Sequence, residues 1–199
     1  MIAILDYGAG NLRSVENALD ELGAPHQRVR TPEALCAAAR IILPGVGHFG
    51  QLIRSLDELG LRAPLKRRIQ AGAPFLGICL GLQALFEGSE EAPGAAGLGV
   101  LSGIVRRFGP GARVPHMGWS PVAPRPGTAL FRRAGRQPYF YFAHSFYAPL
   151  TEAAAARCDY TVPYTAAVER GSLFGVQFHP EKSGPLGLLI LRNFLEAPC

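Results

Sequence analysis

Short apolar runs alternate with amphipathic segments through the first half of the chain. Ile2–Leu5 is an unbroken apolar run, which is typical of a strand whose sheet is covered on both faces. Apolar residues then recur at helical spacing from Leu12 to Leu22 and stop before Gly23, a residue type that often follows a helix end. The pattern therefore predicts a buried strand followed by a helix that packs on the sheet.

The same alternation continues to about residue 86 and predicts a parallel sheet covered by helices. Further strands are expected at Arg28–Arg30, Arg40–Leu43 and Pro74–Ile78. Further helices are expected at Ala34–Ala39, Ala63–Ala71 and Leu80–Phe86.

The second half of the chain has strand-like segments separated by turn residues, which favours antiparallel strands added to the sheet. They are Leu98–Arg107, Tyr139–His144, Ala154–Val162, Thr165–Glu169 and Leu173–His179. A last helix is expected at Pro185–Leu195, with Ser183 as its cap. We predict an α/β fold in one domain over residues 1–199: three layers with a mainly parallel central sheet, flanking helices and antiparallel additions.

Composition agrees with a globular protein, because 48% of the 199 residues are hydrophobic and 18% are charged. No run approaches the ~18 apolar residues that a membrane helix needs. The N-terminus has no basic segment ahead of its apolar run, so we expect no signal peptide and a cytoplasmic protein without membrane association. The four cysteines and five histidines form no ligand pattern, so we expect reduced thiols and neither a metal nor a cofactor.

The net charge is +5 and the pI about 9.3, a balance that raises the question of nucleic-acid binding. The basic residues are scattered in pairs and one triplet, and only Lys66 and Lys182 are lysines. This distribution indicates biased codon usage more than a phosphate-binding stripe. We therefore expect no nucleic-acid partner.

The most informative segment is an apolar strand that runs into Gly77-Ile-Cys79-Leu-Gly81 and then into a helix. This is the Gly-x-nucleophile-x-Gly pattern of a nucleophile elbow, with cysteine in place of serine. A sharp turn needs glycine on either side of the nucleophile, and a helix N-terminus favours a thiolate. The alternative is a structural cysteine buried in the core.

A thiol nucleophile needs a base, and the base needs a group that orients it. His179 and Glu181 follow a predicted strand that ends near Gln177. If that strand is parallel to the one before Cys79, both sites lie at the carboxyl edge of the sheet, where open α/β sheets bind ligands. A capping histidine and a solvated glutamate are the alternative interpretations.

A glycine-bracketed loop, Pro44-Gly-Val46-Gly47, follows another predicted strand. Such a loop can aim a backbone N–H at a developing oxyanion, and Val46 is the expected donor. The N–H of Leu80, next to the nucleophile, would be the second donor. A plain tight turn is the alternative.

These motifs resemble the class I (triad) glutamine amidotransferases, and within them the glutaminase subunit of imidazole glycerol phosphate synthase, an enzyme of histidine biosynthesis. The resemblance covers nearly the whole chain. The segments that carry it are Asp6–Leu12, Pro44–Gly50, Gly77–Gln83, Pro115–Trp119, Phe142–Phe146 and Phe178–Ser183. Phe146 departs from the pattern, since many relatives have tyrosine there.

The resemblance implies that Cys79 attacks the side-chain amide of L-glutamine, with His179 as acid and base and Glu181 as its orienting group. Glutamate and ammonia would be the products. The implied substrate-binding residues are Gly47, Gln83, Glu91, His144, Ser145 and Phe146. A solvated acidic loop is the alternative for Glu91.

The resemblance further implies a partner, a (β/α)8-barrel cyclase that forms a heterodimer with this chain and consumes the ammonia. The implied interface residues are Asn11, Met117, Trp119, Tyr141 and Lys182. Trp119 is the only tryptophan, and we expect it on a loop as an interface anchor, with a core position as the alternative. Other readings remain open: the glutaminase subunit of another amidotransferase, a non-catalytic binding subunit on the same fold, and a cysteine hydrolase acting on another amide.

Overall fold

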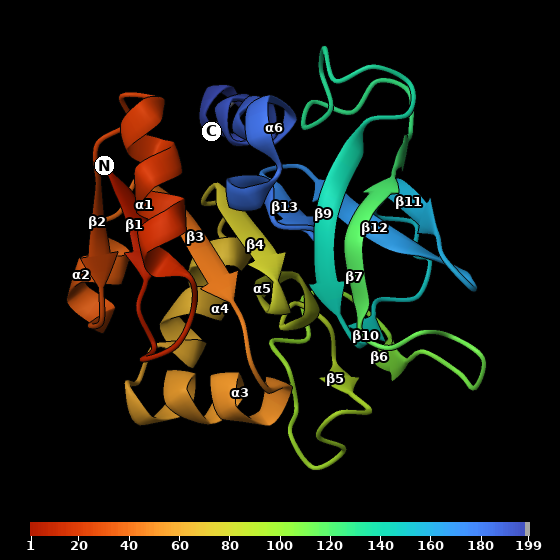
Figure 1. The fold of residues 1–199 in the computed structure, drawn as a ribbon. Helices are drawn as coiled ribbons and strands as arrows, with labels where there is room; N and C mark the ends of the chain where they lie inside the picture. The colour runs from red at the N-terminus through yellow and green to blue at the C-terminus, as the bar shows by residue number, and fades with distance from the viewer. Residues whose placement is uncertain (198–199) are drawn as a thin grey trace.

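The computed structural model describes residues 1–197 and builds them around an eight-stranded sheet (Figure 1). The strand order is β2-β1-β3-β4-β13-β12-β11-β8. The strands are β1 (Ile2–Leu5), β2 (His26–Val29), β3 (Arg40–Gly45), β4 (Phe75–Cys79), β8 (Ala123–Pro124), β11 (Ala154–Asp159), β12 (Pro163–Arg170) and β13 (Leu173–Val176). From β2 to β13 neighbours run parallel, and β12, β11 and β8 are added antiparallel. This confirms the predicted fold class.

Helices cover both faces of this sheet, because its strands alternate their apolar side chains between two cores. Ile42 of β3 belongs to the core under α1 (Leu12–Glu21) and α6 (Gly184–Glu196). Its neighbours Ile41 and Leu43 belong to the core on the other face. That face carries α2 (Pro32–Cys36), α3 (Phe49–Glu58), α4 (Arg62–Gln70) and α5 (Leu80–Gln83).

Two smaller sheets flank the central one. β7 (His116–Pro121) pairs antiparallel with β9 (Tyr139–His144), and the buried side chains of β9 pack in the α6 core. β10 (Phe146–Tyr147), β6 (Ile104–Arg107) and β5 (Gly88–Ser89) form the other small sheet. The strand predicted at Tyr139–His144 is therefore confirmed as β9. Our expectation that it would join the central sheet is wrong, because it pairs with β7 in a separate sheet.

The region from residue 84 to 103 differs most from the sequence prediction. α5 ends at Gln83 rather than Phe86, and the strand predicted from Leu98 begins only at Ile104. The backbone N–H groups of residues 98–101 bond the carbonyls of residues 84–86 instead of a neighbouring strand. Gly99 and Gly103 both have positive φ, which breaks the extended run.

Other differences are a missed helix and shifts at element ends. α3 is not among the helices predicted from the sequence, although Leu52, Ile53 and Leu56 bury a stripe at helical spacing. α2 and β2 lie two residues earlier than the starts we predicted. β11 and β13 end three residues before the predicted ends, and β12 extends beyond both ends of its predicted segment.

The described part of the chain contains neither a membrane-spanning helix nor a cluster of metal-ligating side chains. No helix within residues 1–197 is both long and apolar enough to cross a bilayer. The same residues contain no group of three or more His, Cys, Asp or Glu side chains that could hold a metal ion.

Candidate active site

Cys79 lies at the junction of β4 and α5, in a backbone conformation that L-residues rarely adopt. Its φ is 54° and its ψ −105°. Such strain costs roughly 1–3 kcal/mol and persists where the surrounding structure enforces it, which is typical of functional sites. The thiol side chain is buried, and the residue stands at the start of α5.

The glycines around Cys79 are required by sterics. A Cβ at Gly77 would collide with the carbonyl of Gly81, and one at Gly81 would collide with the carbonyl of Leu43. A Cβ at Gly45 on β3 would come within 2.6 Å of Leu80 Cβ. The backbone of α5 therefore packs directly on β3 and β4, which is the packing that the elbow pattern predicted.

His179 follows β13, which pairs parallel with β4, so both residues lie at the same edge of the sheet. The His179 ring is almost fully buried, and its Nδ1 is 2.8 Å from Glu181 Oε1. Glu181 lies on the short 3-10 helix η1 (Pro180–Lys182), and its side chain is equally buried. The structure thus brings together the three residues that sequence analysis predicted as a triad.

The electrostatics around His179 favour its cationic form. Burial lowers the pKa of His179, but hydrogen bonds with Cys79 and Glu181 and the charges of the same two groups raise it, giving a pKa of about 10. An imidazolium next to a cysteine favours the thiolate, which is the nucleophilic form. The site therefore places a cationic proton donor, His179, between the Cys79 side chain and the Glu181 carboxyl group that orients it.

Gln177 is a site residue that sequence analysis missed. It is fully buried directly after β13. Its Nε2 donates to Cys79 Sγ at 3.6 Å, and its Oε1 accepts from Gln83 Nε2 at 3.1 Å. A buried glutamine at the end of an apolar strand was the available signal, because a buried amide has to find partners.

The loop that follows β3 carries the predicted oxyanion residues. Gly47 has φ +97°, and nothing lies within 4 Å of a Cβ built on it, so conformation rather than space requires glycine there. Val46 is exposed beside it. The buried hydroxyl of Tyr7 faces the Val46 N–H but makes no hydrogen bond, and burial raises the pKa of Tyr7.

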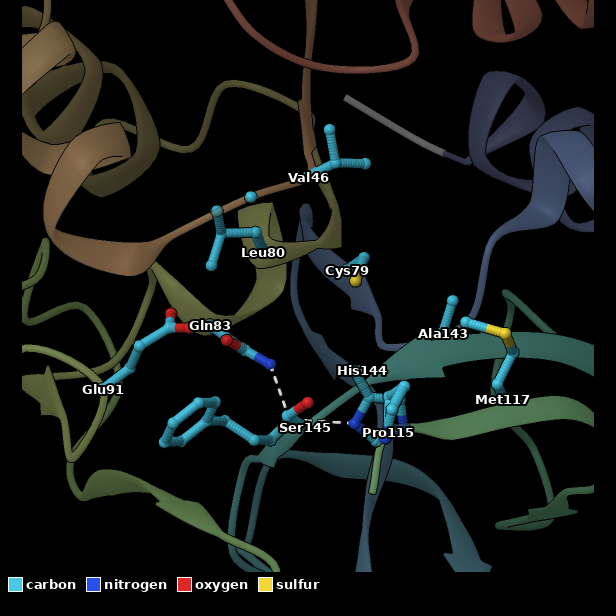
Figure 2. A pocket seen from close by; sticks show the side chains of 12 residues that line it. Val46, Cys79, Leu80, Gln83, Glu91, Pro115, Met117, Ala143, His144 and Ser145 are labelled. Carbon is cyan, nitrogen blue, oxygen red and sulfur yellow. Dashed lines mark hydrogen bonds between the residues drawn. The ribbon is translucent and has the colours of Figure 1, made fainter. Parts of the chain in front are cut away.

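A cavity of about 190 Å³ opens at Cys79 (Figure 2). It is lined by Val46, Gly47, Cys79, Leu80, Gln83, Glu91, Pro115, Met117, Ala143, His144, Ser145 and Phe146. All the predicted substrate-binding and oxyanion residues are among them, although they come from widely separated stretches of the sequence between residues 46 and 146.

Hydrogen bonds hold the polar wall of this cavity in place. Gln83 Nε2 donates to the Phe146 carbonyl at 2.8 Å, and His144 Nδ1 lies 2.8 Å from the same carbonyl (Figure 2). Glu91 is partly buried and accepts from the backbone N–H of Phe49 at the start of α3, at 2.7 Å. Glu91 is therefore part of the cavity wall, not a freely solvated loop residue.

Three of the predicted interface residues lie beside this cavity on the outer face of the β7–β9 sheet. Met117 and Trp119 are 64% and 55% exposed, and Trp119 pairs across the strands with Tyr141. Lys182 Nζ lies 5.9 Å from the centre of the Tyr141 ring. The loop prediction for Trp119 is wrong: β9 supplies a pairing partner, so residues 116–121 form a strand despite their glycine and prolines.

Asn11 and Ser183 each precede a helix, and their side chains make local hydrogen bonds. Asn11 precedes α1, and its side chain accepts from Ser14 Oγ at 2.9 Å. Ser183 is the N-cap residue of α6 as predicted, but its hydroxyl does not bond an N–H of that helix. It donates to the His179 carbonyl and accepts from the Tyr141 N–H, so it ties the triad segment to β9.

Among the described residues the cysteines other than Cys79 stand apart from the triad. Cys36 is exposed and Cys158 is buried, and both are free thiols. Burial raises the pKa of Cys158 to about 11, so its thiol is neutral. Cys199, for which we expected a reduced thiol, lies outside the described residues.

Comparison with known proteins agrees with this geometry. A sequence model of the family "Glutamine amidotransferase class-I" matches residues 3–197. The chain is 49% identical over 197 residues to "Imidazole glycerol phosphate synthase subunit HisH" of Methanothermobacter thermautotrophicus, covering 98% of both chains. It is also 49% identical to the HisH subunit of Moorella thermoacetica over 198 residues, covering 98% of this chain and 94% of the relative.

Solved structures show the same fold. One is a "Crystal structure of glutamine amidotransferase", with a TM-score of 0.79 at 24% identity, covering 98% of this chain and 97% of that one. Its identity is too low to indicate more than the fold. The family model and the curated relatives, however, each span almost the entire chain, and the chain belongs to the class-I glutamine amidotransferases, in the family of imidazole glycerol phosphate synthase HisH subunits.

Proposed function

We propose that this chain is the glutaminase subunit of an imidazole glycerol phosphate synthase and hydrolyses L-glutamine to glutamate and ammonia. The observation that carries the proposal is the buried array of Cys79, His179 and Glu181 beside a cavity, in which His179 Nδ1 lies 2.8 Å from Glu181 Oε1 and the neighbouring Cys79 raises the pKa of His179. Such an array serves nucleophilic catalysis on an amide or ester. The 49% identity to HisH subunits supports this substrate and this pathway over the other glutaminase subunits that the sequence left open.

The chemistry divides into two steps at Cys79. The thiolate attacks the carboxamide carbon, the tetrahedral intermediate collapses, and His179 gives its proton to the departing nitrogen, so that ammonia leaves and a glutamyl thioester remains. His179, now neutral, takes a proton from water as the water attacks the thioester. The C–S bond breaks, glutamate leaves, and the thiolate and imidazolium are restored. Glu181 keeps the imidazole oriented throughout.

The oxyanion of each tetrahedral intermediate needs hydrogen-bond donors. In our proposal the backbone N–H of Leu80, at the start of α5, is one donor. The Val46 N–H, which faces the Tyr7 hydroxyl in the structure, becomes the other donor when the loop turns this peptide toward the cavity. The strained backbone at Cys79 and the positive φ of Gly47 support this assignment, because both hold peptide groups in orientations that ordinary residues avoid.

The far end of the cavity suits the amino-acid end of glutamine. Both N–H groups of the Gln83 amide are used, one by the Phe146 carbonyl and one by Gln177, so Gln83 can offer the cavity only its oxygen. We propose that this oxygen and the Glu91 carboxylate bind the α-ammonium group. Gly47 and the backbone of His144, Ser145 and Phe146 complete the site.

We propose that the outer face of β7 and β9 binds the partner, a (β/α)8-barrel cyclase, in a heterodimer. Met117 lines the cavity and is also exposed on this face, so a bound partner would cover the mouth of the site. Trp119, Tyr141 and Lys182 provide aromatic and cationic anchors. Asn11 is the remaining proposed contact. One domain of residues 1–199 would carry all these roles.

A glutamine analogue with an electrophilic ketone in place of the amide tests the proposal. The chain, with the cyclase partner present, is incubated with this analogue, and the modified residue is located by mass spectrometry. We expect modification of Cys79 that excess L-glutamine prevents, while Cys36 serves as an internal control because it is an exposed thiol. Equal labelling of Cys36 and Cys79, or no protection by glutamine, would contradict the proposal.

A further inference from the structure

A continuous series of hydrogen bonds runs from the outer strand β7 to the cavity wall. Ser120 Oγ lies 2.8 Å from His116 Nε2, and His116 Nδ1 lies 3.1 Å from the Tyr164 hydroxyl. The same hydroxyl lies 3.3 Å from His144 Nε2, and His144 Nδ1 lies 2.8 Å from the Phe146 carbonyl. The triad chemistry uses none of Ser120, His116 and Tyr164.

The chemistry of the last acceptor fixes the direction of every bond in this series. A carbonyl only accepts, so His144 Nδ1 carries a hydrogen. Burial, with a smaller effect from neighbouring histidines, lowers the pKa of His144 to about 3, so the ring is neutral and its Nε2 is an acceptor. The Tyr164 hydroxyl therefore donates to His144.

The directions of the hydrogen bonds between Tyr164 and β7 follow from the same donor and acceptor rules. Since the Tyr164 hydrogen is used, its oxygen accepts from His116, and His116 Nδ1 carries the hydrogen. Burial lowers the pKa of His116 to about 4, so His116 is also neutral, and its Nε2 accepts from the Ser120 hydroxyl. The thiol of Cys158, the cross-strand neighbour of Tyr164, also faces the Tyr164 hydroxyl, and burial raises the pKa of this thiol to about 11, so it is neutral at pH 7.

This series ends on the carbonyl that also holds Gln83. Phe146 O accepts both from His144 and from Gln83 Nε2 (Figure 2). Its position decides how the Gln83 amide is turned, and therefore whether an oxygen or an N–H faces the substrate. Tyr164 is fully buried, and the two histidines are packed between aromatic rings, so the series has a fixed path.

We propose that Tyr164 is a positioning residue for substrate binding. Its hydroxyl bridges His116 and His144, and the His144 ring in turn fixes the Phe146 carbonyl that holds the Gln83 amide. The orientation of Gln83 therefore depends on a series of hydrogen bonds that begins on strand β7. This inference rests on the proposed function, because it assigns Gln83 to the amino-acid end of glutamine. That end is remote from the reacting amide, so the Tyr164 hydroxyl should govern KM for glutamine more than kcat.

The protonation pattern is tested first, on the wild-type chain alone and without any activity measurement. Nitrogen-15 NMR distinguishes the two neutral forms of histidine from each other and from the cation. We expect His116 and His144 both to be neutral at pH 7 with the hydrogen on Nδ1. A hydrogen on Nε2 of either ring, or a protonated ring, would overturn the inference.

The positioning role is tested with Tyr164→Phe, which removes the hydroxyl and keeps the ring. In the complex with the cyclase we expect KM for glutamine to rise roughly tenfold, with kcat within about twofold of wild type. Tyr160→Phe is the matched control, because the Tyr160 ring likewise packs against His116, with 4.0 Å between the ring centres, while its hydroxyl donates to the Arg113 carbonyl.

An unchanged KM in Tyr164→Phe, an equal fall of kcat, or the same rise of KM in Tyr160→Phe would each overturn the positioning role. A general loss of stability is separated from it by the split between KM and kcat. A wild-type complex that releases no glutamate would contradict the proposed function instead, and the histidine spectra would still decide whether the hydrogen-bond series has the inferred direction.

Discussion

Single residues set the chemistry of this site, and the charge on His179 is the most consequential. Its pKa of about 10 is the balance between burial, which lowers it, and the hydrogen bonds with Cys79 and Glu181, which raise it. We expect the imidazolium to persist from pH 7 to above pH 9, and Glu181→Gln or Cys79→Ala to move its deprotonation to lower pH. Titration of the His179 ring nitrogens by NMR checks this. A wild-type midpoint near 6.5 would contradict the electrostatic account.

The raised pKa also has a consequence for stability. Between the unfolded value of about 6.5 and the folded value of about 10, the native state holds a proton on His179 that the unfolded state does not. This contribution is therefore fully present below pH 6.5 and is lost as pH rises toward 10.

The elbow glycines give a sharp stability prediction at the same scale. Gly81→Ala should lower the free energy of unfolding by about 2–3 kcal/mol, because its Cβ would meet the Leu43 carbonyl and the backbone of β3 cannot yield cheaply. Gly94→Ala is the matched control, since nothing lies within 4 Å of a Cβ there, and it should change stability by at most about 0.5 kcal/mol. Denaturant unfolding measures both. Equal effects would show that Gly81 is not sterically required.

The triad could be predicted from the sequence, because a nucleophile elbow and a histidine followed closely by a glutamate are recognisable motifs. Such motifs did not predict Gln177 or Tyr164, since their roles depend on which buried groups they face across the fold. The roles assigned to the triad and cavity residues stay predictions. The structure shows only that they lie together.

At the scale of elements, the loop after β3 and the β7–β9 sheet decide how the cavity is closed. Gly47→Val should reduce glutaminase activity of the complex by at least about tenfold, because a β-branched residue resists the φ of +97°. Gly111→Val is the matched control: Gly111 has φ +94° and equally open surroundings away from the cavity. Steady-state assays compare the two, and similar losses in both would argue against a specific role for the loop.

The exposed aromatic face of β7 and β9 should dominate partner binding. Trp119→Ala should weaken the complex with the cyclase roughly ten- to hundredfold, because a large exposed ring loses its contact, and should leave the thermal stability of the isolated chain nearly unchanged. Val162→Ala, at another exposed apolar residue, should have no effect on binding. Calorimetric titration measures the affinities. Unaltered binding by Trp119→Ala would place the interface elsewhere.

Local pattern predicted most of the parallel half of the fold, since β1, β3 and β4 contain short apolar runs separated by amphipathic segments. It failed at β7, where the strand exists only because β9 lies beside it, and at residues 98–103, which bond the end of α5. Both cases depend on pairing between distant segments, and local propensity does not report such pairing.

At the scale of the whole molecule, the fold brings together groups that are far apart in the chain. Gln177 and Cys79 are 98 positions apart in sequence, yet the parallel pairing of β13 with β4 places them in contact. The β7–β9 sheet lies next to the same cavity, because Met117 of β7 is one of the residues that line it. One edge of the molecule thus carries the nucleophile, the substrate wall and the proposed docking face.

The most direct test of this account is glutamate release from L-glutamine by the chain alone, and by the chain with the cyclase and its acceptor nucleotide. Cys79→Ala serves as the control for the nucleophile. We expect strong release only when partner and acceptor are both present, and none from Cys79→Ala under any condition. Release by Cys79→Ala, or no release from a folded wild-type complex, would contradict the account.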